Sequence, residues 1–237
     1  KARELSRGFG SRAEAVLIGD GVKERAGELT AYGADCVYVA DSPELEQYDT
    51  ELYTGILARA IEAHKPYAVL FPSTINGRDL AARLAARLEL GLTGDCIGLE
   101  TDSEGRLVRL KPAFGGTIVA PILSNTMPQM ATVRPGILMA CQPDWSIEPA
   151  TRKLPVNDLG KPRVKVLKTV QDRSLAGGEL EHARRVVGVG KGIGGPDNLS
   201  MIQPLVAALG ASIGATREVT DAGWLPRQGQ IGLSGDR

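Results

Sequence analysis

The chain has few of the side chains that protein metal sites use most. Its 237 residues include three cysteines and two histidines. Cys36, Cys96 and Cys141 stand far apart, with no CxxC pair and no metal-ligand spacing. These counts exclude a zinc finger, an iron–sulfur module, a disulfide scaffold and a histidine-rich metal site. Cys96 and Cys141 lie in apolar stretches, so we expect buried, unreactive thiols there.

An excess of charge of either sign is also lacking. Lys and Arg together number 28, as do Asp and Glu, which gives a formal net charge of zero. A broad basic surface for nucleic acid is therefore not expected. No apolar run approaches the roughly 18 residues that a membrane span needs. With only His64 and His182 as histidines, and neither at a catalytic spacing, chemistry has to come from backbone, hydroxyl and amide groups or from a cofactor.

Short apolar runs alternate with helical patterns over the first 90 residues. Because the runs are continuous and end at Gly, Asp or Pro, they are typical of strands in a parallel sheet covered by helices on both faces. The sequence therefore predicts a three-layer α/β domain. Its expected strands are residues 15–20, 36–41 and 67–73, and its expected helices are 22–33, 50–66 and 78–90.

The pattern changes after residue 96. Residues 96–114 indicate a hairpin around 103–105, and two further strands follow before residue 140. Residues 149–172 contain three prolines, many charges and no sustained periodicity, which fits either a linker or an extended edge strand. We expect an N-terminal α/β domain over 1–150, a linker over 151–183, and the start of a Rossmann-like domain over 184–237. Both ends look cut, so we expect a longer natural protein.

A glycine-rich loop opens the C-terminal region. Gly190, Gly192 and Gly195 fit G-x-G-x-x-G after an apolar strand at 185–189 and before a helix near 198–209. Glycines let a phosphate approach the backbone closely, although a tight turn without a ligand fits the same pattern. About 20 residues further on, an acid would bind an NAD ribose. Thr216 and Arg217 stand there instead, which suits a flavin or another phosphate better.

Two other loops have a polar pattern. Gln230–Gly235 offers amide, hydroxyl and backbone groups to a ligand, or forms a surface loop. In the first domain, Ser73, Thr74 and Arg78-Asp79 lie where a strand ends and a helix begins, the edge where parallel sheets bind ligands. Capping of the helix and a local Arg78–Asp79 ion pair explain the same residues.

Taken together, these segments resemble the alpha subunit of the electron transfer flavoproteins. The resemblance covers nearly the whole chain in order. It is carried by the following segments: Pro72-Ser-Thr with Gly77-Arg-Asp-Leu80, Leu92-Thr-Gly-Asp-Cys96, Lys111-Pro-Ala-Phe-Gly-Gly116, Pro128-Gln-Met-Ala-Thr-Val-Arg-Pro-Gly136, Gly214-Ala-Thr-Arg217, Asp221-Ala-Gly-Trp-Leu-Pro226 and Gln230-Ile-Gly-Leu-Ser-Gly235.

The resemblance implies an FAD-carrying subunit that shuttles electrons between dehydrogenases and a downstream acceptor, rather than a self-contained enzyme. It implies a heterodimer with a beta subunit, partners such as acyl-CoA dehydrogenases, and a cytoplasmic or, in eukaryotes, mitochondrial-matrix location, of which we expect the cytoplasm. Some members split electron pairs between two acceptors. The alternatives are an NAD-dependent dehydrogenase with a C-terminal nucleotide-binding domain and a non-catalytic nucleotide sensor.

The resemblance also implies a set of flavin-binding residues and no catalytic or metal-binding ones. Lys191 stands where the family often has Arg, and Leu233 and Ser234 replace a Gln and a Thr of the family's flavin loop. These exchanges concern the tuning of the flavin potential more than binding. The expected cofactor-binding residues are Gly190, Lys191, Gly192, Thr216, Arg217, Gln230, Ile231, Gly232, Leu233 and Ser234.

Overall fold

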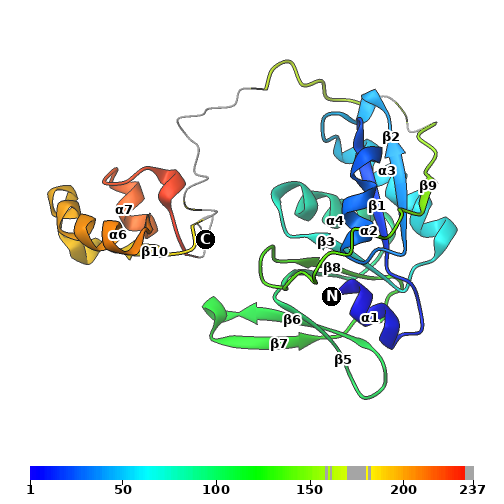
Figure 1. Ribbon diagram of the computed structural model, residues 1–237, viewed down its shortest axis with the longest axis horizontal. Helices are drawn as coiled ribbons and strands as arrows, with labels where there is room; N and C mark the ends of the chain where they lie inside the picture. The colour runs from blue at the N-terminus through cyan, green and yellow to red at the C-terminus, as the bar shows by residue number, and fades with distance from the viewer. Residues whose placement is uncertain (158–159, 161, 170–179, 181–182, 233–237) are drawn as a thin grey trace. The chain divides into compact units, whose positions relative to one another are not determined.

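A computed structural model describes all residues of the chain except 158–159, 161, 170–179, 181–182 and 233–237. The chain divides into two compact units, Lys1–Val166 and Leu167–Arg237 (Figure 1). None of the described helices has the length and apolar content needed to cross a membrane.

The first unit contains most of the secondary structure. Its strands form two parallel sheets, ordered β1-β2-β9 and β3-β8-β4, and one antiparallel sheet, β5-β6-β7. In chain order its elements are α1 (Ala2–Gly8), β1 (Glu14–Gly19), η1 (Val22–Arg25), α2 (Ala26–Ala31), β2 (Cys36–Asp41), η2 (Pro43–Leu45), α3 (Thr50–His64), β3 (Ala68–Pro72), α4 (Ile75–Arg87), β4 (Leu92–Cys96), β5 (Gly98–Thr101), β6 (Leu107–Ala113), η3 (Phe114–Gly116), β7 (Ile118–Ile122), β8 (Gln129–Val133) and β9 (Thr151–Lys153).

The continuous apolar sequence of strand β2 is explained by burial of both of its faces. Successive side chains of a strand point to opposite faces, and here both faces are covered. Cys36, Tyr38 and Ala40 pack in the cluster that includes residues of α3. Val37 and Val39 pack with α2 on the other side. The prediction of a parallel sheet between two layers of helices is therefore confirmed.

The second parallel sheet is also covered on both faces, one by a helix and the other by α1 together with the antiparallel strands. On one face, Phe71 of β3 and Met130 of β8 pack with Leu80 and Leu84 of α4. On the other face, β3 residues pack in a cluster with α1 and the antiparallel strands, around Leu5, Leu99 and Leu107. The expected hairpin is formed by β5 and β6.

Residues 151–153 belong to the first unit's sheet. They form β9, which pairs in parallel with β2, with Val37 opposite Thr151. Of the two interpretations of residues 149–172, the edge strand is therefore the one that the structure shows at this position. A linker starting at residue 151 is wrong for these three residues, because they pair with β2 and the ladder continues on both sides, where the Val37 N–H donates to the Ala150 carbonyl and the Leu154 N–H to the Val39 carbonyl.

The second unit contains a pair of parallel strands, β10 and β11, joined through helical turns. The expected helix near 198–209 is divided into a 3-10 segment and a short α-helix, and it begins earlier, at Pro196. The elements are β10 (Val186–Val189), η5 (Lys191–Ile193), η6 (Pro196–Ile202), α6 (Gln203–Leu209), β11 (Ser212–Ala215), α7 (Arg217–Asp221) and η7 (Arg227–Gly229).

Candidate functional site

The glycine loop and the 216–217 segment meet at one edge of the β10–β11 pair. Val189 lies opposite Ala215 in the parallel register. Gly190 and Thr216 follow these two residues, and the Thr216 N–H donates to the Val189 carbonyl at 2.9 Å. The carboxyl ends of both strands therefore point to the same place, where nucleotides bind in open parallel sheets.

A third segment reaches the same edge. The Ile231 N–H donates to the Ala215 carbonyl at 2.8 Å. Gln230 is buried, and its Oε1 accepts a hydrogen bond from the Thr220 hydroxyl at 2.7 Å. The amide of Gln230 thus holds this segment to the body of the unit, while Ile231 and Gly232 continue along the edge.

Ile231 lies across the two strands and explains two of the glycines. A Cβ atom on Gly214 would lie 2.5 Å from Cγ2 of Ile231, and one on Gly188 would lie 3.1 Å from its Cδ1. The first distance is shorter than real Cβ contacts. Gly214 is therefore needed for packing within the chain.

The loop glycines have a different surrounding. A Cβ atom on Gly190, Gly192 or Gly195 would meet no heavy atom of the described residues within 4 Å, and none of the three has a φ that side chains avoid. Neither packing nor backbone conformation within the described chain requires glycine there. An open, side-chain-free surface at the ends of parallel strands fits the close approach of a dinucleotide's phosphates.

Asn198 closes the loop, and the sequence analysis missed it. Its Nδ2 donates to the Ile193 carbonyl at 2.8 Å, five residues back. The loop also carries its own turn, in which the Ile193 N–H donates to the Gly190 carbonyl. An asparagine directly after Pro-Asp is the local signal that could have indicated this contact, because such side chains commonly bond nearby backbone groups.

The polar side chains expected at this edge differ in their availability. Lys191 is exposed, and its amine forms no ion pair with a described residue. Thr216 occupies the N-cap of α7, yet its hydroxyl makes no capping bond. Arg217, in contrast, pairs with Asp221 at 3.1 Å. Leu233 and Ser234 lie outside the described residues.

The loop after β3 in the first unit serves the fold. Thr74 caps α4, since its Oγ1 accepts from the Gly77 N–H at 3.1 Å. Arg78 donates from Nε to the carbonyl and hydroxyl oxygens of Ser73, both at 2.9 Å. Asp79 instead accepts from the Tyr48 hydroxyl at 2.6 Å. The capping interpretation is thus confirmed, and the local Arg78–Asp79 ion pair is wrong.

Asp95 connects the carboxyl ends of the β3-β8-β4 sheet. It accepts hydrogen bonds from Arg134, which follows β8, and lies 3.7 Å from the Arg78 guanidinium. The Arg134 hydrogen bonds hold the pKa of the Asp95 carboxyl below its usual value, against the opposite effect of partial burial. The ligand edge of this sheet is therefore occupied by the chain's own ion pairs.

The remaining candidates form no site among the described residues. The part of the chain that the structure describes has no group of three or more His, Cys, Asp or Glu able to hold a metal. Cys96 is buried as predicted, and burial raises the pKa of its thiol. The expectation for Cys141 is wrong. Its thiol is exposed and donates to the Tyr32 carbonyl, because the segment around it runs over the surface.

Comparisons with known families agree with this geometry. Residues 1–163 match the family model of the electron transfer flavoprotein domain. Residues 179–237 match that of the electron transfer flavoprotein FAD-binding domain. The second match contains all three segments of the edge described above. FAD is therefore the cofactor of this domain, and the NAD-dependent dehydrogenase alternative is not supported.

Individual relatives cover the chain from end to end. It is 39% identical over 238 residues to an electron transfer flavoprotein subunit alpha of Thermoanaerobacterium thermosaccharolyticum, covering 99% of this chain and 72% of the relative. It is 39% identical over 240 residues to the lactate dehydrogenase (NAD(+),ferredoxin) subunit LctC of Acetobacterium woodii, covering 99% and 56%. It is 35% identical over 241 residues to the protein FixB of Azorhizobium caulinodans, covering 98% and 64%.

The two domain matches and these relatives all support the family that the sequence motifs resemble. The first match alone spans more than half of the chain. The chain belongs to the electron transfer flavoprotein alpha subunit family.

Proposed function

We propose that this chain carries FAD and shuttles electrons between dehydrogenases and a downstream acceptor, as the alpha subunit of a heterodimer. The observation that supports this most strongly is the edge of the β10–β11 pair. Three segments meet there, and neither packing nor backbone conformation within the described chain requires the glycines of the first segment, Gly190, Gly192 and Gly195. Bound at this edge, FAD would supply the redox chemistry, and the protein would supply position and electrostatics.

The chain's own residues would divide the binding work. The backbone of Gly190 and Gly192 would face the phosphates, because nothing on those residues blocks approach. The Thr216 hydroxyl makes no capping bond to α7 and would donate to the bound group. Lys191 would place a cation near the bound group. Ile231 and Gly232, followed by Leu233 and Ser234, would extend the contact along the edge, while Gln230 and Arg217 hold the local structure.

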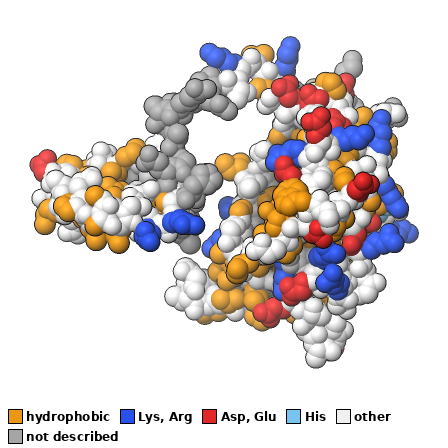
Figure 2. All heavy atoms as spheres, in the orientation of Figure 1, with side chains coloured by type: hydrophobic (Ala, Val, Ile, Leu, Met, Phe, Trp, Pro, Cys, Tyr) orange, Lys and Arg blue, Asp and Glu red, His pale blue; other side chains and the backbone are white. Residues whose placement is uncertain are grey.

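Exposed apolar side chains on β7 and in the turns beside it support an interface with the beta subunit. Strand β7 lies at the edge of the β5-β6-β7 sheet. Phe114 is 82% exposed, Ile118 53%, Val119 46% and Met127 59%. Hydrophobic side chains are visible on the surface of the first unit in Figure 2. Exposed apolar groups of this size are typical of protein interfaces, so we assign β7 and the turns beside it to the interface with the beta subunit.

The electron donors that we propose are flavin dehydrogenases, such as acyl-CoA dehydrogenases. The Acetobacterium woodii relative is a subunit of a lactate dehydrogenase by its name, which supports a dehydrogenase partner here. We also propose a cytoplasmic location. Its support is that Cys36, Cys96 and Cys141 are all free thiols, as is usual in a reducing compartment.

The test is to express the complete natural chain with its beta subunit and to record the visible spectrum of the purified complex. Flavin absorbance that disappears when an acyl-CoA dehydrogenase and its substrate are added would support the proposal. A colourless complex that reduces NAD would overturn it. In sedimentation, the chain without its beta subunit should form ill-defined associates, and a well-behaved monomer would contradict the heterodimer.

A further inference from the structure

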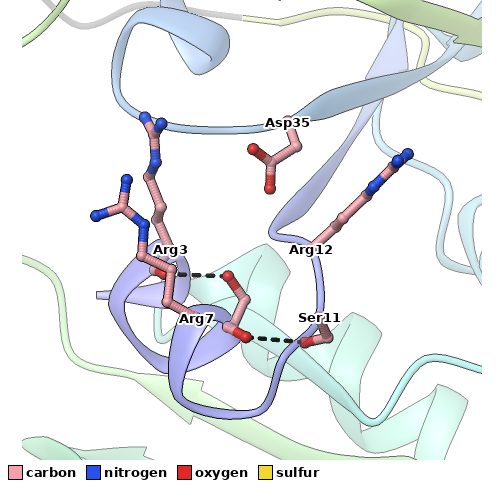
Figure 3. Close-up of a pocket in the computed structure, with 6 residues that line it drawn as sticks. Arg3, Arg7, Ser11, Arg12 and Asp35 are labelled. Atoms are coloured by element: carbon pink, nitrogen blue, oxygen red, sulfur yellow. Dashed lines mark hydrogen bonds between the residues drawn. The ribbon is translucent and has the colours of Figure 1, made fainter.

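A cavity in the first unit, remote in sequence from the flavin residues, is lined mainly by cations. Its volume is about 490 Å³, within the range of small-molecule sites. Figure 3 shows Arg3 and Arg7 extending side by side from α1 and the Asp35 carboxylate directed into the space beside them, while Arg12 lies on the other side and its side chain extends away from them. The lining residues are Arg3, Ser6, Arg7, Ser11, Arg12 and Asp35.

The arginines of this cavity form no close ion pair. None of Arg3, Arg7 and Arg12 lies within 4.0 Å of a carboxylate oxygen of a described residue, although the charge of Arg3 acts on the Asp144 carboxylate at longer range. Arg3 and Arg7 also stand one turn apart on α1, a spacing at which like charges repel and weaken a helix. The Arg3 and Arg7 guanidinium groups on one side of the cavity, with Asp35 as the carboxylate in its lining, leave positive charge there that an anionic ligand would neutralise.

The cavity wall is fixed by the fold. The Ser6 hydroxyl donates to the Arg3 carbonyl at 3.0 Å, and the Ser11 hydroxyl donates to the Ser6 carbonyl at 3.3 Å. Gly33 has a φ of +105°, and a Cβ atom on it would lie 2.7 Å from Cδ of Arg3. The stem of Arg3 therefore lies directly on the Gly33 backbone, which places its guanidinium at the cavity before any ligand binds.

Asp35 gives the cavity a second kind of contact. Its Oδ2 accepts from the Ala13 N–H at 2.9 Å, which fixes the carboxylate and leaves Oδ1 without a hydrogen bond to a described residue. A carboxylate oxygen in this position suits a ligand hydroxyl, as in the binding of ribose. Guanidinium forks match the oxygens of a phosphate group.

We propose that this cavity binds a small molecule that carries both a phosphate group and hydroxyl groups, with the phosphate on Arg3 and Arg7 and a hydroxyl on Asp35. A sugar phosphate is the simplest member of this class. Inorganic phosphate can make the contact with the arginines but has no sugar hydroxyl for Asp35, so its binding can be distinguished from that of a sugar phosphate.

The test is isothermal titration calorimetry of the complete natural chain, assembled with its beta subunit and FAD. The probes are ribose 5-phosphate, inorganic phosphate and ribose. We expect saturable binding of ribose 5-phosphate, binding of inorganic phosphate weaker by about tenfold, as the loss of one hydrogen bond to a charged group implies, and no binding of ribose.

Variants then assign the binding to the cavity. Arg3→Ala and Arg7→Ala should each weaken ribose 5-phosphate binding by about tenfold or more, because each removes a charge-assisted contact. Arg25→Ala, outside the cavity, should bind normally. Asp35→Asn should bind inorganic phosphate more tightly and lose the preference for the sugar phosphate. Equal circular dichroism spectra and equal thermal unfolding of all variants show that the first unit of each one is folded.

Three results would overturn the proposal. One is the absence of saturable binding by ribose 5-phosphate, which is also the result if an acidic segment of another chain fills the cavity in the complex. Another is unchanged affinity in both arginine variants. The third is equal affinity of the unmodified protein for ribose 5-phosphate and inorganic phosphate.

Discussion

The reason why glycine stands at a position differs between the first unit and the loop of the second unit. In the first unit, a Cβ atom on Gly77 would lie 2.0 Å from the Pro72 carbonyl oxygen, and Gly33 has a backbone conformation that side chains avoid. In the loop of the second unit, Gly190 and Gly192 have neither constraint. The comparison separates glycines that the fold requires from glycines that leave room for something outside the described chain.

The same comparison holds within the second unit. Gly214 lies on the β10–β11 pair under Ile231 and is required by packing, whereas Gly190, one residue beyond β10, faces open space. Substitution by alanine should therefore affect folding at one position and ligand binding at the other. Stability and FAD affinity, measured on the same variants, test this division.

The largest effect is expected for Gly77→Ala. The added methyl group would overlap a backbone carbonyl that cannot move without disturbing β3 and the start of α4. We expect a loss of about 3 kcal/mol in the free energy of unfolding, at the upper end for overpacked positions. Urea unfolding followed by circular dichroism measures it.

Gly27→Ala is the matched control in the first unit. Gly27 is also helical, but a Cβ atom there would meet nothing within 4 Å. Alanine should stabilise the unit by up to about 1 kcal/mol, because glycine is a poor helix former. A Gly77→Ala variant as stable as Gly27→Ala would contradict the packing explanation.

Gly214→Ala should destabilise the second unit by about 1–3 kcal/mol. The new Cβ atom would lie 2.5 Å from Cγ2 of Ile231 and 3.0 Å from Cγ1 of Val186. Ile231→Ala removes the nearer of these groups, so the double variant should regain part of the loss relative to the sum of the single ones. Strict additivity in thermal unfolding would show that Ile231 does not cause the effect.

Gly190→Ala should leave the unfolding of the protein without FAD unchanged and weaken FAD binding by about tenfold, the effect of a methyl group placed against the ligand. Titration of the FAD-free complex with FAD, followed by flavin fluorescence, gives the affinity. Normal FAD affinity would mean that the loop glycines are a turn without a ligand contact.

The sequence allowed the α/β alternation to be predicted because continuous apolar runs such as 36–41 are a local signal. The pairing of strands that lie far apart in the chain leaves no such local signal in the sequence. Strand β9 pairs with β2 more than a hundred residues earlier, and its charged, proline-flanked sequence shows no periodicity. The helix expected over 22–33 begins as the 3-10 segment η1, a boundary that periodicity does not fix.

The candidate site divides in the same way. The glycine loop could be predicted because its motif is contiguous. The hydrogen-bond partner of Arg78 could not be predicted, because its neighbour in the sequence is not its partner in the fold. Arg78 donates to Ser73, and Asp79 accepts from Tyr48. Likewise, the motif predicts Gln230 as a cofactor-binding residue, but it does not predict the bond from Thr220, which depends on a turn that no local pattern indicates.

Thr216→Ala should weaken FAD binding by about tenfold at most, because it removes one neutral hydrogen bond of about 1 kcal/mol. Ser234→Ala is expected to act similarly. Ser200→Ala is a suitable control, since its hydroxyl bonds the Asp197 carbonyl within η6. Unchanged FAD affinity in both the Thr216 and the Ser234 variants would remove these hydroxyls from the flavin site.

The smallest effect is expected for Lys191→Ala, which should lower the midpoint potential of the bound flavin. A cation beside the flavin stabilises the negative charge that reduction adds. Because Lys191 is exposed, the attraction is near its value in water, about 1 kcal/mol at 4 Å, which corresponds to about 20 mV for a two-electron couple.

Lys191→Arg keeps the charge and should keep the potential. Arg184→Ala removes a cation before β10, at the strand end opposite the loop, and should also leave it unchanged. Spectroelectrochemical titration of the complex distinguishes these variants. A potential that Lys191→Ala leaves unchanged, or that Arg184→Ala lowers equally, would mean that Lys191 is a solvated loop residue.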